Sequence, residues 1–279
     1  MEILDGQKLS NKIKTELKSE IKDYMIKPCI AVIQVGNNDN IGTYVEQKKN
    51  FCNDVGIYFK HIEFDEFTTE KEIINKIIEL NNDEYVDGIV LQLPLPLKFN
   101  EKKLVNFITK NKDVEGLTDS NKANLLKKTP NLIPCIPLGI TELLKEYKIS
   151  VEGKHVVIVG RSETVGIPLF CLMNNYDATV TLCHSKTIDL DKYTKQADIL
   201  VSCMDEANII TKDMVKDGSI VIDAGVSLVN NKIVGDVDVE SIKKNVSYIT
   251  SSPDTILSLA GAMLLKNAIF ANKKRNSKI

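Results

Sequence analysis

Hydrophobic and polar positions alternate along the first half of the chain in blocks that predict helices and strands in turn. The expected elements are, in order, a helix over 6–24, a strand at 30–35, a helix over 43–55, a strand at 59–64, a helix over 69–81 and a strand at 88–96. Short apolar strands separated by helices are typical of a parallel α/β sheet, in which functional side chains gather at the carboxyl ends of the strands. We therefore expect an α/β fold with its chemistry at that edge.

The second half of the chain repeats this alternation after a loop rich in proline. The prolines within 127–139 mark a domain boundary near residue 135. Strands are expected at 156–159, 178–183, 197–203 and 219–226, and a last helix over 254–270. The pattern therefore predicts two α/β domains, residues 1–135 and residues 136–253, followed by a helical segment at 254–279.

The stretch 156–187 has the pattern of a nucleotide-binding βαβ unit. A β-branched run ends at Gly160, which permits a sharp turn at the end of a strand. Gly166 lets the next helix begin close to the sheet or to a ligand, where unpaired backbone N–H groups attract phosphate. The Gly-x5-Gly spacing differs from the usual GxGxxG, and a tight turn without any ligand gives the same pattern.

The end of the second strand in this unit favours NADP over NAD. A site for NAD has an acidic residue about 20 residues beyond the glycines, where it accepts from the ribose hydroxyls. This chain instead has His184, Ser185, Lys186 and Thr187 at that place, with Arg161 and Ser162 in the preceding turn. Guanidinium, hydroxyl and ammonium donors suit a 2′-phosphate. Solvated polar side chains at a strand end are the alternative interpretation.

Composition and charge exclude several other classes of protein. The chain has 279 residues, of which 43% are hydrophobic, and its net charge is -2. Neither sign of charge dominates any long segment. We therefore expect no nucleic-acid partner and no membrane partner. No apolar run approaches the roughly 20 residues of a membrane span, so a cytoplasmic location is expected. The six cysteines lack CxxC spacing and the three histidines are scattered, which predicts reduced thiols and no metal site.

The first half of the chain holds the best candidates for acid–base chemistry. Tyr44 and Lys48 are four residues apart in a predicted helix, so their side chains share one face. Gln92 ends a buried apolar strand just before prolines, and a buried amide needs a hydrogen-bond partner. If Gln92 points at the helix that carries Lys48, then an amide, an ammonium and a phenol meet. An ordinary surface pair of tyrosine and lysine is the alternative.

Several ordered motifs resemble those of one known family. They are YVEQK at 44–48, DGIVLQLPLP at 87–96, KDVEG at 112–116, PCIPLG at 134–139, VGRSETVGIP at 159–168, ATVTLCHSKT at 178–187 and GDVD at 235–238. With these motifs the chain closely resembles the methylenetetrahydrofolate dehydrogenase/methenyltetrahydrofolate cyclohydrolase family over practically its full length. The resemblance implies an α/β fold with two domains, a parallel α/β folate domain and a Rossmann-like NADP-binding domain. It also implies that the last helix packs back on the folate domain and that the protein is a homodimer.

The resemblance further implies an activity and roles for individual residues. The family oxidises 5,10-methylenetetrahydrofolate with NADP and hydrolyses the methenyl product to 10-formyltetrahydrofolate. Lys48 matches the lysine that assists proton transfer, Gln92 the residue that orients it, and Tyr44 the tyrosine that stacks on the pterin. Asp113 and Glu115 fall in the motif that binds the pterin. The expected cofactor-binding residues are Gly160, Arg161, Ser162, Gly166, His184, Ser185 and Thr187.

The chain departs from the family's pattern at a few positions. Ile41 and Ile136 stand where the family usually has serine and threonine, and Glu115 where it has aspartate. Asp205 occupies the place of a glycine, and residues 254–258 replace a glycine-rich turn. Three alternatives therefore stay open: a cyclohydrolase with impaired dehydrogenase activity, a remodelled NADP-dependent oxidoreductase, and a catalytically weak relative that keeps the architecture.

Overall fold

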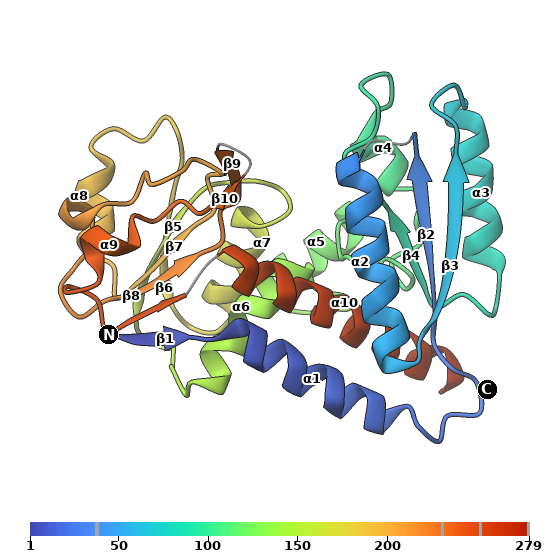
Figure 1. Cartoon of the computed structure of the whole chain (residues 1–279), viewed down its shortest axis with the longest axis horizontal. Coiled ribbons are helices and arrows are strands. Elements are labelled where there is room, and N and C mark those ends of the chain that lie inside the picture. Colours follow the sequence, from blue (N-terminus) through green and yellow to red (C-terminus); the bar gives the residue numbers. More distant parts are fainter. Residues whose placement is uncertain (37–38, 230–231, 251–252, 278–279) are drawn as a thin grey trace. The chain divides into compact units, whose positions relative to one another are not determined.

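The computed structural model describes residues 1–36, 39–229, 232–250 and 253–277 (Figure 1). The chain divides into two compact units, each built from two segments. The three-stranded unit comprises Asn11–Ile133 and Gly261–Ile279, and the six-stranded unit comprises Met1–Ser10 and Pro134–Ala260. Two long helices, α1 (Gly6–Glu20) and α10 (Pro253–Asn276), each contribute residues to both units.

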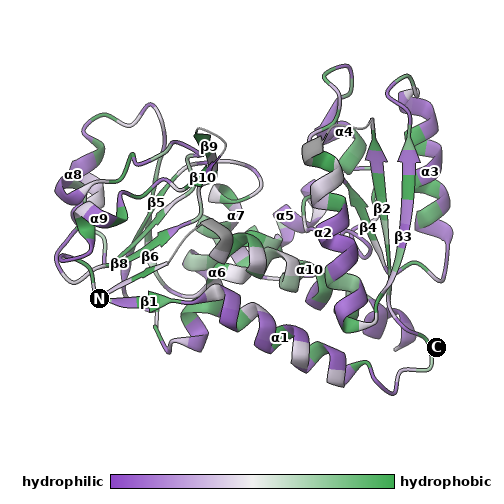
Figure 2. Ribbon diagram, viewed as in Figure 1, coloured by the Kyte–Doolittle hydropathy of each residue, from purple (hydrophilic) through white to green (hydrophobic). Residues whose placement is uncertain are grey.

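The three-stranded unit is a parallel sheet in the order β3-β2-β4. Its strands are β2 (Cys29–Val35), β3 (Tyr58–Phe64) and β4 (Gly88–Leu91), and its helices are α2 (Asp39–Val55), α3 (Glu70–Asn82), α4 (Glu101–Val105) and α5 (Asp119–Leu126). β2 is almost wholly buried, as the continuous apolar run of a central parallel strand predicts. Figure 2 shows the hydrophobic colour along β2 and β4.

Local sequence signals explain how these elements begin and end. Thr69 and Glu72 form a capping box at the start of α3, which satisfies orphan N–H groups of the first turn. The same helix buries Ile73, Ile77 and Leu80, an i, i+4, i+7 stripe that packs on the sheet. β4 ends at Leu91, earlier than the expected 88–96, because the prolines that follow cannot donate to a sheet ladder.

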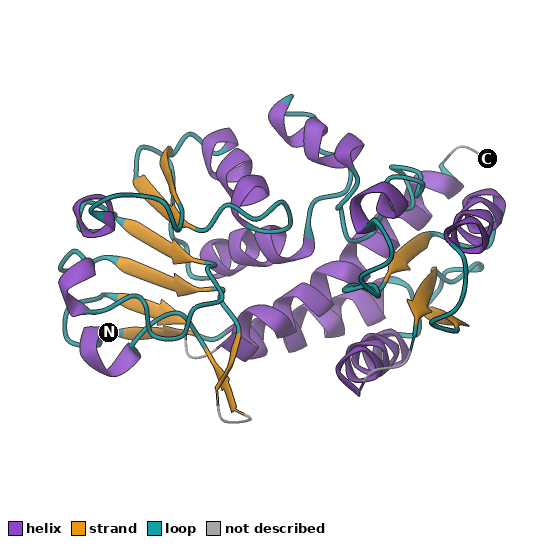
Figure 3. Ribbon diagram, turned by 90° about the horizontal axis from the view of Figure 1, so that it is seen from above, coloured by secondary structure: helices purple, strands orange, loops and turns teal. Residues whose placement is uncertain are grey.

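The six-stranded unit is a parallel sheet in the order β1-β11-β8-β7-β5-β6. Figure 3 shows its strands in orange, with helices beside them. The strands are β1 (Glu2–Leu4), β5 (His155–Val159), β6 (Thr179–Cys183), β7 (Ile199–Ser202), β8 (Ile220–Asp223) and β11 (Tyr248–Thr250). The connecting elements are α6 (Cys135–Glu146), α7 (Gly166–Asn175), α8 (Leu190–Thr194), η1 (Lys212–Met214) and α9 (Val239–Ile242), with a hairpin of β9 (Ser227–Val229) and β10 (Lys232–Val234). The chain passes from β6 to β7 across β5, so the strand order reverses beside β5.

The structure's division differs from the expected domains in its first ten residues. β1 pairs in parallel with β11, and the N–H of Glu2 donates to the carbonyl of Ser247 at 2.7 Å. The start of the chain therefore belongs to the six-stranded unit, whereas the expected boundary put residues 1–135 in one domain. A strand of three residues carries too few positions for a periodic pattern, so sequence did not predict it.

Helix α10 begins at Pro253 and includes residues 254–258, the segment in which a family glycine turn is replaced. Residues 251–252, just before this helix, lie outside the described residues. Within the three-stranded unit, the amide of Asn267 donates to the carbonyls of Val114 and Ile133 at 2.8 and 2.9 Å. Further along, the amide of Asn272 donates to the buried carboxylate of Asp87 at 3.1 Å.

The apolar character of α10 corrects one expectation from the sequence. Within the described residues, Thr255–Asn276 is long and apolar enough to cross a membrane by length and composition alone. The sequence pattern predicts no apolar run long enough to span a membrane, so this helix differs from that prediction. However, 67% of its apolar window is buried inside the protein, which is the behaviour of a core helix.

Candidate active site

Three polar side chains of the three-stranded unit converge at the carboxyl end of β4. The ammonium of Lys48 on α2 donates to the Oε1 atom of Gln92 at 2.6 Å. The same Nζ atom lies 3.3 Å from Oε1 of Glu115, and the two side chains of this ion pair are 19% and 22% exposed. Part of the candidate site expected from the sequence is therefore assembled, with a carboxylate added.

The position of Gln92 in the sheet fixes the orientation of its amide. Its backbone N–H donates to the carbonyl of Ile33 at 2.9 Å, which continues the ladder one residue beyond β4. Its Nε2 donates to the carbonyl of Leu93 at 2.7 Å, so the Oε1 atom is left to face Lys48. Gln92 is only 5% exposed, and this pairing satisfies a buried amide.

Helix α2 presents a different environment on each side of Lys48. Tyr44 lies one turn earlier and is 42% exposed, which leaves its ring available to a ligand. Ile41, at a position of usual serine in the family, is buried. Cys52 lies one turn later and is fully buried, and burial raises the pKa of its thiol to about 12. Cys52 is therefore a neutral core residue.

The two acids of the KDVEG motif have opposite environments. Asp113 is 1% exposed, and its carboxylate accepts from the N–H groups of Leu117 and Thr118 and from the amide of Asn121, at 3.0, 2.8 and 2.9 Å. This geometry supports a structural role for Asp113 in its own loop, and its expected contact with the substrate stays a prediction. The hydrogen bonds of Asp113 fix the turn that contains Glu115. Sequence alone could not separate the two acids, because both are polar and adjacent to the same valine.

A close-packed glycine turn follows β5 in the six-stranded unit. Gly160 has a φ of +125°, and a Cβ atom there would approach the carbonyl oxygen of Cys203 to 2.4 Å. A Cβ atom on Gly166 would approach the carbonyl oxygen of Gly160 to 2.1 Å. Neither position tolerates a side chain, so α7 begins directly against the strand end as a dinucleotide requires. The hydroxyl of Ser162 supports the turn just before this helix, since it accepts from the N–H groups of Val165 and Gly166 at 3.2 and 3.4 Å.

The polar residues that follow β6 divide into two roles. The N–H of His184 donates to the hydroxyl of Thr187 at 2.9 Å, and the Nδ1 atom of His184 accepts from the N–H of Lys186 at 3.1 Å. His184 and Thr187 therefore shape the turn with their side chains. The side chains of Ser185 and Lys186 are exposed, as is that of Arg161.

These two turns lie next to each other at the edge of the sheet. The N–H of Gly160 donates to the carbonyl of Cys183 at 2.9 Å, so the end of β5 is tied to the end of β6. The exposed Arg161 and Ser185 each follow one of these bonded residues closely in the chain. The donors present, with no carboxylate among residues 184–187, fit the 2′-phosphate of NADP.

Two buried carboxylates hold the loops beyond β7 and β8. Asp236 accepts from the hydroxyl of Ser202 and from the N–H groups of Met204 and Glu206, at 2.7, 2.7 and 2.9 Å. Asp223 accepts from the N–H groups of Gly225, Asp236 and Val237 at 3.2, 3.0 and 3.0 Å. Burial raises the pKa of Asp223 to about 6, and the nearby charge of Asp236 also raises it. The hydrogen bonds from the backbone N–H groups act in the opposite direction and lower the pKa. The GDVD motif thus rigidifies the carboxyl edge of the sheet.

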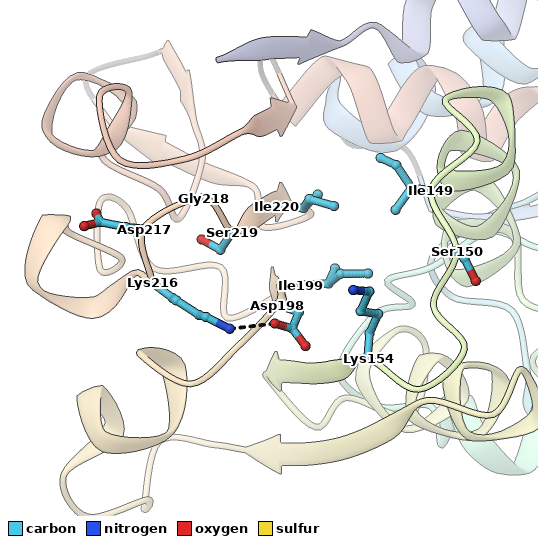
Figure 4. A pocket seen from close by; sticks show the side chains of 10 residues that line it. All are labelled: Ile149, Ser150, Lys154, Asp198, Ile199, Lys216, Asp217, Gly218, Ser219 and Ile220. Atoms are coloured by element: carbon cyan, nitrogen blue, oxygen red, sulfur yellow. Dashed lines mark hydrogen bonds and ion pairs between the residues drawn. The ribbon is translucent and has the colours of Figure 1, made fainter.

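A cavity of about 370 Å³ lies at the opposite edge of this sheet (Figure 4). It is lined by residues that directly precede β5, β7 and β8, among them Lys154, Asp198 and Ser219. Its main polar contact is an ion pair between Lys216 and Asp198 at 2.7 Å. The expected cofactor residues follow the strands instead of preceding them, so this cavity is separate from their site.

Metal chemistry has no visible centre in the part of the chain that the structure describes. No group of three or more His, Cys, Asp or Glu side chains there could hold a metal ion. All six cysteines are free thiols.

The fold and these sites define a class of protein. A doubly wound parallel sheet with a glycine turn, together with a lysine, amide and carboxylate site on a second α/β unit, is the architecture of a two-domain dinucleotide-dependent enzyme. Residues 4–115 match the catalytic domain of tetrahydrofolate dehydrogenase/cyclohydrolase, and residues 134–276 match its NAD(P)-binding domain. The chain belongs to the tetrahydrofolate dehydrogenase/cyclohydrolase family.

Individual relatives are similar over the full length of the chain. A bifunctional protein FolD from a Nitratiruptor species is 45% identical over an alignment of 279 positions that covers 99% of each sequence. The crystal structure of a bifunctional FolD methylenetetrahydrofolate dehydrogenase/cyclohydrolase from Campylobacter jejuni is 41% identical, with a TM-score of 0.96 and 99% of both chains covered. A Trypanosoma brucei methylenetetrahydrofolate dehydrogenase-cyclohydrolase, complexed with NADP cofactor and inhibitor, is 30% identical, with a TM-score of 0.92 and 98% of this chain and 97% of that one covered.

Proposed function

We propose that the protein oxidises 5,10-methylenetetrahydrofolate to 5,10-methenyltetrahydrofolate with NADP and hydrolyses the methenyl product to 10-formyltetrahydrofolate. The observation that carries this proposal is the contact of Lys48 with both Gln92 and Glu115, in a chain that matches the family over residues 4–115 and 134–276. Family membership supplies the reaction, and this constellation supplies the groups that the hydrolytic step needs.

In the hydrolytic step, Lys48 would exchange a proton with the water that adds to the methenyl carbon. Gln92 keeps the Nζ atom in place through the 2.6 Å hydrogen bond, and its own amide is locked by the strand end. Tyr44 offers an exposed ring one turn away, on which a pterin can stack while water is excluded. Glu115 would accept from the amino edge of the pterin.

In the oxidative step, the chain's task is to hold and orient its two ligands. Bound NADP supplies the hydride acceptor. Gly160 and Gly166 would let the backbone approach the pyrophosphate, and the N–H groups at the start of α7 would favour its negative charge. Arg161 and Ser185 would hold the 2′-phosphate. Ser162, His184 and Thr187 would act mainly by keeping these turns in shape, as their hydrogen bonds suggest.

We also assign one ligand to each part of the chain. The three-stranded unit, with the second part of α10, would bind the folate, and the six-stranded unit would bind NADP.

We further propose a homodimer that acts in the cytoplasm, without nucleic-acid or membrane partners. The burial of α10 supports the absence of a membrane anchor in the described residues. The position of β6 at the edge of its sheet leaves a strand available for pairing with a second copy of the chain. Light scattering of the purified protein tests whether it is a dimer.

Two absorbance assays on the purified protein test the activity. The first follows formation of methenyltetrahydrofolate from methylenetetrahydrofolate with NADP⁺, and with NAD⁺ as the control cofactor. The second follows the decay of added methenyltetrahydrofolate without cofactor. We expect both reactions above the uncatalysed rate and a faster first reaction with NADP⁺. Absence of both activities in folded protein would refute the proposal.

A further inference from the structure

Asp205 has an uncommon backbone conformation at the carboxyl edge of the six-stranded sheet. It lies three residues beyond β7 and has a φ of +55°, in the left-handed region that glycine usually occupies. Aspartate adopts this conformation more readily than most residues with a side chain, because its short polar side chain can hydrogen-bond locally. The chain therefore keeps the backbone of a glycine here but adds a carboxylate.

The carboxylate of Asp205 is held in one place by its neighbours. Its Oδ1 atom accepts from the N–H of Val226 at 2.9 Å, which ties the loop after β7 to the loop after β8. The residues on either side, Met204 and Glu206, donate their N–H groups to the buried Asp236. Asp205 itself is exposed. A fixed negative charge therefore faces outward from the carboxyl edge of the sheet.

This charge lies close to the dinucleotide turn but on the other side of β5 from the phosphate donors. Cys203, two residues before Asp205, packs on Gly160 so closely that an added Cβ atom would lie 2.6 Å from its Sγ atom. Arg161 and Ser185 follow β5 and β6, whereas Asp205 follows β7. A dinucleotide bound at a doubly wound sheet crosses the point where the strand order reverses. If its 2′-phosphate end lies over β6, its nicotinamide end lies toward β7 and β8.

We propose that Asp205 makes the cofactor site favour the oxidised cofactor over the reduced one. The nicotinamide ring of NADP⁺ carries a positive charge that the ring of NADPH lacks, while the phosphates of the two forms are the same. A fixed carboxylate on the nicotinamide side attracts only the charged ring. This inference rests on the proposed use of NADP and adds a determinant of its redox form.

The test compares dissociation constants of NADP⁺ and NADPH for the wild type and for Asp205→Asn, measured by calorimetry and by NADPH fluorescence. Asparagine keeps the Oδ1 acceptor for Val226 and tolerates the left-handed conformation, so only the charge is removed. Glu206→Gln is the matched control, because it removes the neighbouring exposed carboxylate. The hydrogen bond to Val226 comes from Asp205, and Glu206 bonds to Asp236 through its backbone N–H. Melting temperatures of the three unliganded proteins confirm that each is folded.

We expect Asp205→Asn to weaken NADP⁺ binding about threefold to fivefold, the upper part of the range of one exposed charge interaction, and to change NADPH binding less than about twofold. Glu206→Gln should change the ratio of the two constants less than about twofold. In the wild type, added salt should reduce the preference for NADP⁺, because screening acts on the charge that distinguishes the two forms.

Two outcomes would overturn the inference. One is an unchanged ratio of the two dissociation constants in Asp205→Asn, which includes an equal loss for both cofactor forms, and the other is the same change of that ratio in Glu206→Gln. If the folded wild type binds neither form, the proposed function fails together with this inference. If it binds both and the ratio ignores residue 205, only the inference fails.

Discussion

The substitution Lys48→Met tests the centre of the proposed hydrolytic site. Methionine fills a similar volume without the ammonium, so the proton-transferring group is removed and the helix is kept. Loss of a positioned general acid–base group lowers a rate by about 10²- to 10⁴-fold, and we expect the hydrolysis of methenyltetrahydrofolate to fall by at least about 10²-fold. The binding of NADP should not change.

The structure limits how much stability this substitution can cost. The ion pair with Glu115 is only partly buried, with side chains 19% and 22% exposed, so its loss costs about 1 kcal/mol or less. The Oε1 atom of the buried Gln92 loses its donor, which costs about 1–3 kcal/mol. The two effects together predict a fall in melting temperature of several degrees at most for a chain of this size. The variant should therefore be folded at assay temperature.

Lys49→Met is the matched control on the same helix. Lys49 is 47% exposed and pairs with Glu46 at 3.1 Å on the surface, away from Gln92. This change should leave the hydrolysis rate within about twofold of the wild type, since exposed pairs contribute little. The assay is the decay of methenyltetrahydrofolate absorbance, with circular dichroism as a check of folding. A folded Lys48→Met that hydrolyses at the wild-type rate, or a Lys49→Met that loses as much, would refute the assignment.

Three further changes test other parts of the molecule. Arg161→Ala should weaken NADP binding about ten- to a hundredfold and leave NAD binding nearly unchanged, as calorimetry can measure. Because burial raises the pKa of Asp223 to about 6, the stability that this group contributes is complete below about pH 4 and is lost as the pH rises through 6. Urea denaturation should therefore show a fall of up to about 3 kcal/mol in the unfolding free energy between pH 4 and 7. In Asp223→Asn the dependence of the unfolding free energy on pH should be shallower. Changing Asp254, Thr255 and Leu257 together to glycine should raise the ratio of dehydrogenase to cyclohydrolase activity if the altered segment limits hydride transfer, and an unchanged ratio in folded protein would reject that idea.

The sequence predicted best where one local pattern determines the structure. The β-branched run before Gly160 became β5, because a central parallel strand needs a continuous apolar run and the turn after it needs a positive φ. The contact of Lys48 with Gln92 was also anticipated, since a helix face and a strand end each have a predictable direction. These inferences required no knowledge of loops.

Features that depend on loops or distant pairing could not be predicted. The strand β1 exists only because β11 offers it an edge, and the pairing of Glu115 with Lys48 depends on the path of the turn that Asp113 organises. The sequence also marked Asp205 as a departure but not its partner Val226, which follows a different strand. In each case the partner lies far along the chain, where periodicity gives no information.

The start of α10 shows why a rewritten segment need not be a damaged one. Thr255 and Leu259 are 3% and 0% exposed, and both press on Gly6, where an added Cβ atom would lie 2.5 Å from the methyl of Thr255. The hydroxyl of Ser10 donates to the carbonyl of Ser258 at 2.9 Å, and that of Ser258 donates to Gln7. The turn that has lost its glycines can therefore still pack closely on α1, because the glycine that permits the contact is Gly6 on α1. The segment forms an ordered helical turn in the six-stranded unit, so any effect on hydride transfer would come from where this turn places its backbone and not from looseness.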